Sequence, residues 1–447
     1  MAKQLFGTDG IRGKAGQYPL DPSTAYAVGL ALAQTLGGGA GGRTVIGMDT
    51  RASGPELAEL LAAGLAAGGL ETEFAGVLPT AGVSYLTETG GYRAGVMISA
   101  SHNPFDDNGI KVFAPTGFKL ADAVEHVVEE AVFRLLEQGV EPRRAALTVD
   151  ASLRDRYLAH ILWAGRPAAE IAKRRVVVDC ANGAASPLAA EFFRALGAEA
   201  EIFANEPDGL NINRDCGSLH LDKLQRRVVE TGADLGVAFD GDADRALFVA
   251  DDGEIVDGDA ILLLAGEYLA GRGELPLSRV VTTVMANMGL EKALAASGVS
   301  MTRTAVGDKY VLEEMVSTGA GLGGEQSGHI IFKQWANTGD GLLTAKMMLE
   351  VLSEAGAPLS ELRKRLQVFP QKLVNVRVTS RPKIEDVPAL AAAAADCENA
   401  LGDRGRLVLR YSGTEPLARI MIEAETMELV ETHCEALREA FVREIGA

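Results

Sequence analysis

Three aspartates lie close together near the middle of the chain, directly after a short apolar segment. They are Asp240, Asp242 and Asp244, and Arg245 follows them at once. Crowded carboxylates repel one another and raise each other's pKa unless a cation neutralises them. Oxygen ligands of this kind favour Mg²⁺ or Ca²⁺ over softer metals. A solvated acidic turn has the same pattern, so the metal site becomes the better hypothesis only if other residues give the metal something to act on.

Two known acidic motifs match this segment poorly. An EF-hand loop that starts at Asp240 needs Gly at its sixth position and Glu at its twelfth, where the chain has Arg245 and Asp251. A phosphatase of the haloacid dehalogenase type has Thr or Val at the fifth position of its motif, where this chain has Asp244. The segment is therefore not an EF-hand loop. It matches the motif of an aspartate-based phosphatase only in part, and such a phosphatase remains an alternative.

A second candidate is Ser101, which lies in the segment ISASHNP after an apolar run. Pro104 would end the strand, and a hydroxyl at the carboxyl edge of a sheet is well placed to be a nucleophile. We do not expect His102 to be its base, because adjacent residues of an extended chain point to opposite sides. The alternative is an Asn-Pro turn with incidental polar residues. Paired with the aspartate cluster, the segment favours a phosphorylated serine that a metal could neutralise.

Two other segments are typical of anion-binding turns. Residues 410–416, RYSGTEP, place hydroxyls and a glycine beside Arg410, and Arg419 follows in the next apolar segment. Successive backbone N–H groups with two arginines would bind a phosphate. Residues 6–13, FGTDGIRG, add a Gly-rich turn with Arg12. The alternatives are an ordinary hairpin loop and a common glycine turn.

A third polar segment, GGEQSGH, suits sugar hydroxyls. It brings together Glu325, Ser327 and His329 directly before an apolar strand. These side chains offer both hydrogen-bond donors and acceptors. The alternative is a polar loop in which His329 has a structural role.

Composition limits the possible partners. The chain has 447 residues and a formal net charge of −18, so phosphate repulsion argues against nucleic acid. A local basic pocket could still bind a small phosphorylated substrate. The four cysteines are scattered without a C-x-x-C pair, so neither a disulfide framework nor a zinc site is expected. No signal segment and no membrane span is recognised, and we expect a cytoplasmic protein.

The elements that must position these residues form a repeating α/β pattern. Short apolar runs alternate with amphipathic stretches, as in a strand over 45–49, a helix that Ser53 would cap, and a helix over 122–138. Several strands end in Asp or Ser, which places these side chains at the carboxyl edges of sheets. After Pro370 the pattern changes to half-exposed strands over 372–378 and 406–410 with a closing helix.

We therefore expect three α/β domains and a smaller C-terminal α+β domain. The predicted boundaries are 1–152 with the serine loop, 153–253 with the aspartate loop, 254–370 with the sugar-recognition loop, and 371–447 with the phosphate-binding turn.

Taken together, the five segments resemble the α-D-phosphohexomutase family. FGTDGIRG, SASHNP, DGDADR, GEQSGH and RYSGTEP occur in that family's order and spacing, and the match covers essentially the whole chain. The first and fourth segments resemble the members that act on glucosamine phosphate. The resemblance implies three similar α/β domains with mixed sheets and a smaller fourth domain around a central cleft.

The resemblance also implies a role for each candidate residue. One Mg²⁺ would be held by Asp240, Asp242, Asp244 and the phosphate on Ser101. The residues that it implies for catalysis are Ser101, Lys111, Arg245, His329 and Arg12. The residues that it implies for substrate binding are Glu325, Ser327, Arg410, Ser412, Gly413, Thr414 and Arg419.

The implied reaction interconverts glucosamine 6-phosphate and glucosamine 1-phosphate. It would pass through a phosphoserine enzyme and glucosamine 1,6-bisphosphate, and would feed the synthesis of UDP-N-acetylglucosamine and cell-wall precursors. An activating kinase or the bisphosphate would load Ser101, and a homodimer is left open. The alternatives are a phosphomannomutase or phosphoglucomutase with the same mechanism, a Mg²⁺-dependent sugar phosphatase, and a sugar-phosphate-binding regulator without turnover.

The chain departs from the family pattern at two positions. Ala243 stands where the family usually has Gly, which removes backbone freedom, but we expect metal binding to survive because the three carboxylates remain. Tyr411 stands where Lys is common, which removes one positive charge near the predicted phosphate site.

Overall fold

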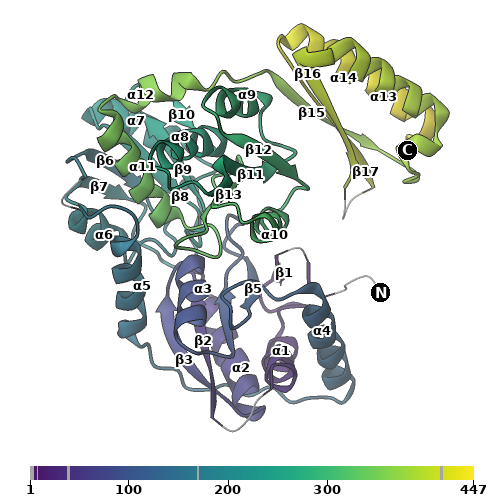
Figure 1. Cartoon of the computed structure of the whole chain (residues 1–447). Helices are drawn as coiled ribbons and strands as arrows, with labels where there is room; N and C mark the ends of the chain where they lie inside the picture. The colour runs from purple at the N-terminus through teal and green to yellow at the C-terminus, as the bar shows by residue number, and fades with distance from the viewer. Residues whose placement is uncertain (1–4, 8, 38–40, 169–170, 413–415) are drawn as a thin grey trace.

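Four sheets with their helices follow one another in the described part of the chain (Figure 1). The computed structural model describes residues 5–7, 9–37, 41–168, 171–412 and 416–447. The first three sheets are mixed or mostly parallel and carry helices in α/β order, whereas the last sheet is antiparallel. The predicted fold class, three α/β units and a smaller C-terminal α+β unit, is confirmed.

The first sheet has the strand order β1-β5-β4-β2-β3. Strand β2 pairs in parallel with β3 and β4, whereas β5 runs antiparallel to β4 and β1. Its strands are β1 Ile11–Lys14, β2 Gly42–Met48, β3 Leu70–Val77, β4 Ala94–Ile98 and β5 Asp107–Phe113. Its helices are α1 Pro22–Thr35, α2 Gly54–Ala67, α3 Thr80–Thr89 and α4 Asp122–Glu137.

Helices α1 and α2 approach each other closely because glycines face each other at their contact. A Cβ on Gly29 would lie 2.2 Å from the Leu61 carbonyl oxygen, and a Cβ on Gly64 would lie 2.2 Å from that of Tyr26. The helix that was expected to begin at Ser53 does begin there, but the Ser53 side chain does not cap it. Its hydroxyl instead accepts a hydrogen bond from Asn108 Nδ2 at 2.8 Å, so the expected cap is wrong.

The second sheet has the order β10-β9-β8-β6-β7 and the third has β12-β11-β13-β14. The second unit comprises α5 Ala151–Trp163, β6 Arg175–Asp179, α6 Ala189–Ala195, β7 Glu199–Phe203, α7 Asp222–Thr231, β8 Leu235–Phe239, β9 Ala246–Ala250 and β10 Ile255–Val256. The third comprises α8 Gly258–Gly271, the 3-10 turn η2 Pro276–Ser278, β11 Arg279–Thr283, α9 Met288–Ala296, β12 Ser300–Thr304, α10 Asp308–Thr318, β13 Leu322–Gly324, β14 Ile330–Phe332, α11 Gly341–Ala355, α12 Leu359–Leu362 and η3 Arg363–Arg365.

One buried hydrophobic core runs through parts of all three α/β units. It includes Val83 of α3, Phe192 of α6 and Leu263 of α8, so these units pack against one another rather than only touching through loops. This packing therefore fixes the relative positions of the loops after β4 and β8, which carry Ser101 and the three aspartates. None of the described helices has the length and apolar character that a membrane crossing requires.

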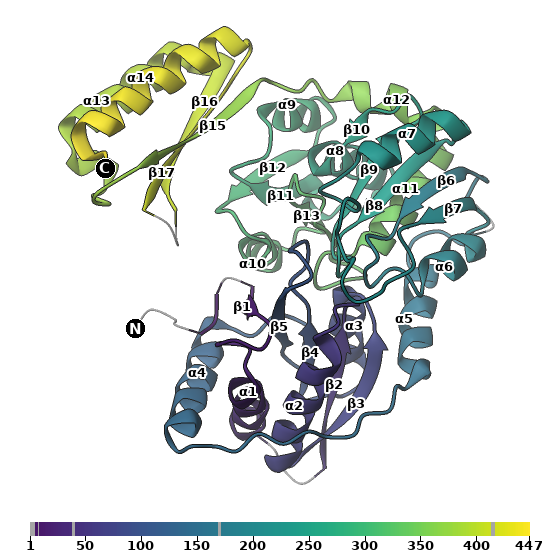
Figure 2. The ribbon, with the colours of Figure 1, turned by 180° about the vertical axis from the view of Figure 1, so that it is seen from behind.

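The C-terminal unit stands apart from the other three in both views (Figures 1 and 2). Its sheet has the order β15-β17-β16, and α13 and α14 cover one face. Its elements are β15 Gln371–Arg377, η4 Ile384–Asp386, α13 Pro388–Leu401, η5 Gly402–Arg404, β16 Gly405–Tyr411, β17 Leu417–Ala424 and α14 Met427–Ile445. It has a hydrophobic core of its own.

A small set of polar contacts joins this unit to the third one. Arg406 of β16 donates from Nη1 to the Val284 carbonyl oxygen at 2.8 Å and from Nε to Glu423 at 2.6 Å. Glu423 in turn accepts the Met288 backbone N–H at 2.8 Å. The contact is confined to one end of the C-terminal sheet.

Candidate active site

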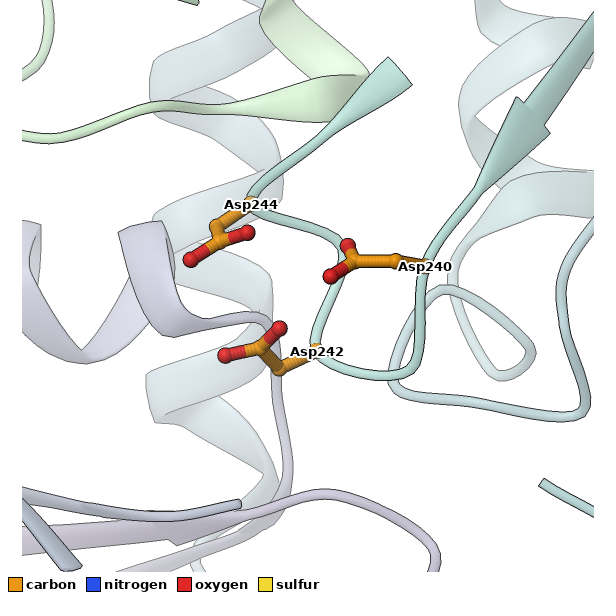
Figure 3. A group of neighbouring side chains, drawn as sticks. All are labelled: Asp240, Asp242 and Asp244. Atoms are coloured by element: carbon orange, nitrogen blue, oxygen red, sulfur yellow. The ribbon is translucent and has the colours of Figure 1, made fainter. Parts of the chain in front are cut away.

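The three aspartates form a buried cluster between β8 and β9. Each offers a carboxylate oxygen, and these oxygens lie within 4.8 Å of one another. Figure 3 shows the carboxylates of Asp240, Asp242 and Asp244 pointing toward a common space. Asp242 Oδ1 and Asp244 Oδ1 are buried and have no hydrogen-bond partner among the described residues. Burial, followed by the charges of Asp244 and Asp242, raises the pKa of Asp240 well above its usual value. Orphaned, crowded carboxylate oxygens fit a hard divalent cation.

The loop that carries the aspartates turns through Ala243. This residue has a φ of 54°, in the left-handed region where a Cβ is unfavourable. Its carbonyl oxygen accepts the Gly341 N–H at 3.0 Å, which holds the turn. A glycine would adopt this conformation more easily, but the side chains of the three aspartates still converge.

Ser101 lies beside the aspartates although it belongs to the first unit. Its Oγ donates to Asp240 Oδ2 at 2.6 Å, and the residue is buried. Its φ of 52° turns the chain sharply after β4. Because of this turn, His102 Nδ1 comes within 3.3 Å of Ser101 Oγ, so the expectation that the two side chains point apart is wrong. Burial, together with the charges of Arg245 and Arg12, lowers the pKa of His102 to about 4.

Lys111 on β5 faces the same cluster. Its Nζ lies 2.8 Å from Asp242 Oδ2 and 3.3 Å from Asp244 Oδ2. Asp9, which also pairs with Arg12, lies 3.3 Å from Lys111 Nζ. Burial alone would lower the pKa of Lys111, but the carboxylates of Asp242, Asp9 and Asp244 outweigh it and raise that pKa. Lys111 is therefore a buried ammonium in this arrangement, and Arg12 reaches it through Asp9.

Arg245 and His329 also contact the aspartates. Arg245 donates its backbone N–H to Asp240 Oδ1 at 3.2 Å, and its Nε lies 3.9 Å from Asp244 Oδ1. His329 Nδ1 lies 3.7 Å from Asp244 Oδ2, and its Nε2 accepts the Gly339 N–H at 3.0 Å. Burial alone would lower the pKa of His329, but the charges of Asp244 and Asp308 outweigh it and raise that pKa.

Glu325 and Ser327 lie in the loop between β13 and β14, two residues apart and close to His329. Glu325 Oε1 accepts the Gly307 N–H at 3.2 Å. Ser327 Oγ is buried and has no hydrogen-bond partner among the described residues. A buried hydroxyl without a partner is suited to a ligand hydroxyl.

The residues of the predicted phosphate turn lie in the C-terminal unit. Arg410 of β16 and Arg419 of β17 are register partners in the antiparallel sheet, and Arg419 Nη2 lies 3.5 Å from Ser412 Oγ. Gly413 and Thr414 lie outside the described residues. The sheet that carries these side chains stands away from the aspartate loop (Figure 1). The structure therefore brings together the candidates from the first three units but keeps Arg410, Ser412 and Arg419 of the fourth separate.

Several site residues were not found from the sequence. Thr80 donates from Oγ1 to Asp242 Oδ2 at 2.5 Å, and Lys119 forms ion pairs with Asp9 and with Asp308 of the third unit. The Asp in FGTDGIRG was part of a recognised motif and could have been proposed. Thr80, Lys119 and Asp308 carry no local pattern, because their partners lie in other parts of the chain.

All four domain models of one family match the chain. They are the phosphoglucomutase/phosphomannomutase α/β/α domains I, II and III, at residues 3–138, 155–253 and 257–369, and the C-terminal domain at 373–440. A phosphoglucosamine mutase from Solibacter usitatus is 51% identical over 447 residues, with 100% of both chains covered.

Solved structures have the same fold. A phosphoglucomutase/phosphomannomutase family protein from Burkholderia thailandensis matches with a TM-score of 0.82 and 26% identity, covering 99% of each chain. An N-acetylphosphoglucosamine mutase from Aspergillus fumigatus, in complex with GlcNAc-6P and magnesium, matches with a TM-score of 0.65 and 19% identity over 98% of this chain and 96% of its own.

Proposed function

Because the chain belongs to the phosphoglucomutase/phosphomannomutase family, we propose that it interconverts glucosamine 6-phosphate and glucosamine 1-phosphate. The observation that carries the proposal is the 2.6 Å hydrogen bond from Ser101 Oγ to Asp240. It places a nucleophilic hydroxyl of one domain on a cation site of another. The choice of an amino sugar is supported by the 51% identity to the Solibacter usitatus relative.

The cation site suits Mg²⁺. Asp240, Asp242 and Asp244 would hold the ion together with one oxygen of a phosphate on Ser101, and the orphaned oxygens Asp242 Oδ1 and Asp244 Oδ1 are available for it. When bound, the ion would offset the negative charge on the phosphoryl group in transfer.

Ser101 would act as the phosphoryl carrier. The bond between its Oγ and phosphorus breaks while a free sugar hydroxyl forms a new bond to phosphorus, which yields glucosamine 1,6-bisphosphate. The hydroxyl proton passes to a base at the site. After the intermediate turns over, Ser101 Oγ takes the other phosphoryl group, and the proton returns to the sugar oxygen. No phosphate is lost in this cycle.

The surrounding side chains would neutralise charge, transfer protons and bind the substrate. Arg245 would neutralise charge on the phosphoryl group, while Lys111 and His329 would move protons at the reacting oxygens. Arg12 would contribute positive charge to the site through its ion pair with Asp9, which also contacts Lys111. Glu325 and Ser327 would hold sugar hydroxyls. Residues of the C-terminal unit would bind the phosphate that is not being transferred, and they are Arg410, Ser412, Gly413, Thr414 and Arg419.

Replacing His329 by Gln should lower kcat by about 10²–10⁴-fold with little change in KM, because a proton-transfer group is lost and an amide replaces it. Steady-state kinetics of the purified variant measures the effect. His126→Gln, a half-buried residue of α4 that pairs with Glu130, is the matched control and should keep full activity. A His329→Gln enzyme with unchanged kcat would show that the ring has no part in the reaction.

Purified protein with Mg²⁺ and a trace of glucosamine 1,6-bisphosphate tests the substrate. We expect kcat/KM for glucosamine 6-phosphate to exceed that for glucose and mannose 6-phosphates by at least about tenfold. Phosphorus NMR distinguishes the 1-phosphate from free phosphate. Preference for glucose or mannose phosphate would favour a phosphoglucomutase or phosphomannomutase, and release of free phosphate would favour the phosphatase.

The proposed function also has a domain arrangement, a location and a source of the phosphate on Ser101. We propose the domain boundaries 1–152, 153–253, 254–370 and 371–447, with the substrate in a cleft between the domains, and a cytoplasmic location. The product would supply the synthesis of UDP-N-acetylglucosamine and cell-wall precursors. A kinase or the bisphosphate would load Ser101, and intact mass before and after incubation with the bisphosphate would distinguish the two routes.

A further inference from the structure

A single buried arginine binds most of the turn that carries Ser101. Arg51 Nη2 donates to the carbonyl oxygens of Ser101 at 2.9 Å and Asn103 at 2.8 Å. Its Nη1 donates to the carbonyl oxygen of Asp107 at 3.0 Å and also to that of Pro104. One guanidinium therefore gathers four carbonyl groups of the segment that follows β4.

Asp49 completes this arrangement at the end of β2. Its Oδ2 accepts Arg51 Nε at 2.9 Å and Ser99 Oγ at 2.6 Å. Ser99 Oγ accepts the backbone N–H of Ser101 at 2.9 Å. All five N–H groups of the Arg51 guanidinium thus have acceptors, which a fully buried arginine requires. A lysine could not reach four carbonyl groups and the carboxylate at once.

The second domain binds the same turn through Asn213. Asn213 Nδ2 donates to the carbonyl oxygen of Ser101 at 2.9 Å and to that of Asn103 at 3.1 Å. A Cβ on Gly241 would lie 2.4 Å from the Ser101 carbonyl oxygen, so the aspartate loop itself packs against this group. The Ser101 carbonyl is therefore held by one donor from the first domain and one from the second.

The turn needs such support because of its conformation. Ser101 has a φ of 52°, which a residue with a side chain adopts only when its surroundings hold it there. This φ also directs Oγ toward Asp240 rather than along the strand. Loss of a donor would let the turn relax and carry Oγ away from the aspartates.

We propose that Arg51 and Asn213 are positioning residues that hold the Ser101 turn from two domains, so that Ser101 Oγ faces the aspartate cluster. The inference rests on the proposed role of Ser101 as phosphoryl carrier. It assigns the two residues to the transfer step rather than to sugar binding, because neither lies in the 323–329 loop or in the C-terminal unit.

Asn213→Ala tests the contact that joins the two domains. We expect kcat to fall by about 10–100-fold while KM for glucosamine 6-phosphate stays within about twofold. The reason is that Asn213 would position the reacting hydroxyl of Ser101 without binding the sugar. The rate at which glucosamine 1,6-bisphosphate phosphorylates Ser101, followed by intact mass in single turnover, should fall by the same factor. Asn211→Ala is the matched control, since Asn211 lies in the same loop but donates to Glu206.

Arg51→Lys should have the larger effect, about 10²–10³-fold in kcat, because one ammonium cannot replace the guanidinium. Arg43→Lys is its control, since Arg43 lies on β2, which precedes the Arg51 loop, and bonds Glu73 and the Gly90 carbonyl oxygen instead of the turn. If Arg51→Lys does not fold, the Asn213→Ala result decides.

Equal kcat and equal phosphorylation rates in Asn213→Ala and wild type would overturn the inference. A fall in activity that only follows the fraction of folded protein, measured by thermal unfolding, would overturn it too. Wild-type protein without any turnover would instead contradict the proposed function, so the two failures are distinguishable.

Discussion

Replacement of Ser101 by Ala is expected to reduce mutase turnover by at least about 10⁴-fold. In the proposed cycle, the Oγ atom that donates to Asp240 carries the phosphoryl group, and this variant lacks it. Alanine adopts the left-handed φ of 52° as readily as serine does, so the turn should persist. Steady-state rates and the mass of the protein after incubation with glucosamine 1,6-bisphosphate measure the loss of both turnover and phosphorylation.

The Ser101→Ala protein also distinguishes the mutase from the phosphatase alternative. In a phosphatase that used Asp240 as nucleophile, release of free phosphate would survive the change. Ser317→Ala, on the exposed side of α10, is the control and should behave as wild type. Thermal unfolding with and without Mg²⁺ verifies that the variant is folded and that its aspartates are intact. Turnover at the wild-type rate would contradict the mechanism.

Replacing Asp240 by Asn is expected to abolish the stabilisation by Mg²⁺ and lower kcat by about 10³-fold or more. One of three carboxylates is lost, and the remaining pair is offset by Lys111 and Arg245. For wild type, Mg²⁺ at a hundredfold excess over its Kd should add about 2.7 kcal/mol to the free energy of unfolding. Calorimetric titration and thermal unfolding at several Mg²⁺ concentrations measure both effects.

The metal-free Asp240→Asn protein provides an independent result. Burial and the charges of Asp244 and Asp242 disfavour ionised Asp240, which its raised pKa reflects. A neutral amide removes this repulsion, so the metal-free variant should unfold at the same temperature as metal-free wild type or a higher one. Asp155→Asn, an exposed residue of α5, should leave both the Mg²⁺ response and kcat unchanged. A wild-type Mg²⁺ response in Asp240→Asn would contradict the metal site.

Local patterns predicted the elements well because hydrophobic periodicity and turn residues act over a few positions. The helix expected over 122–138 is α4, Asp122–Glu137, and the strand expected over 372–378 is β15, Gln371–Arg377. The α/β order placed Ser101 and Asp240 at the ends of strands, where side chains gather in such folds. The cap expected at Ser53 was wrong, because Asn108 from β5 binds its hydroxyl.

Other features depend on contacts between distant segments. The chain separates Ser101 from Asp240 by 139 residues, and only packing of two domains brings their side chains to 2.6 Å. The same holds for the pairing of Lys111 with Asp242 and for the hold of Asn213 on the Ser101 carbonyl. His102 approaches Ser101 Oγ because the folded turn gives Ser101 a positive φ, which no local pattern indicated.

By itself, then, the sequence determined which groups are present and at which sheet edges they lie, since residue type, periodicity and turn signals are local. The tertiary structure decided which groups meet. It set the charge state of the site, because burial and the neighbouring carboxylates raise the pKa of Asp240, whereas carboxylates outweigh burial and raise the pKa of Lys111. It also decided how the reacting hydroxyl is aimed, because the hydrogen bonds that hold its turn come from Arg51 on one domain and Asn213 on the next.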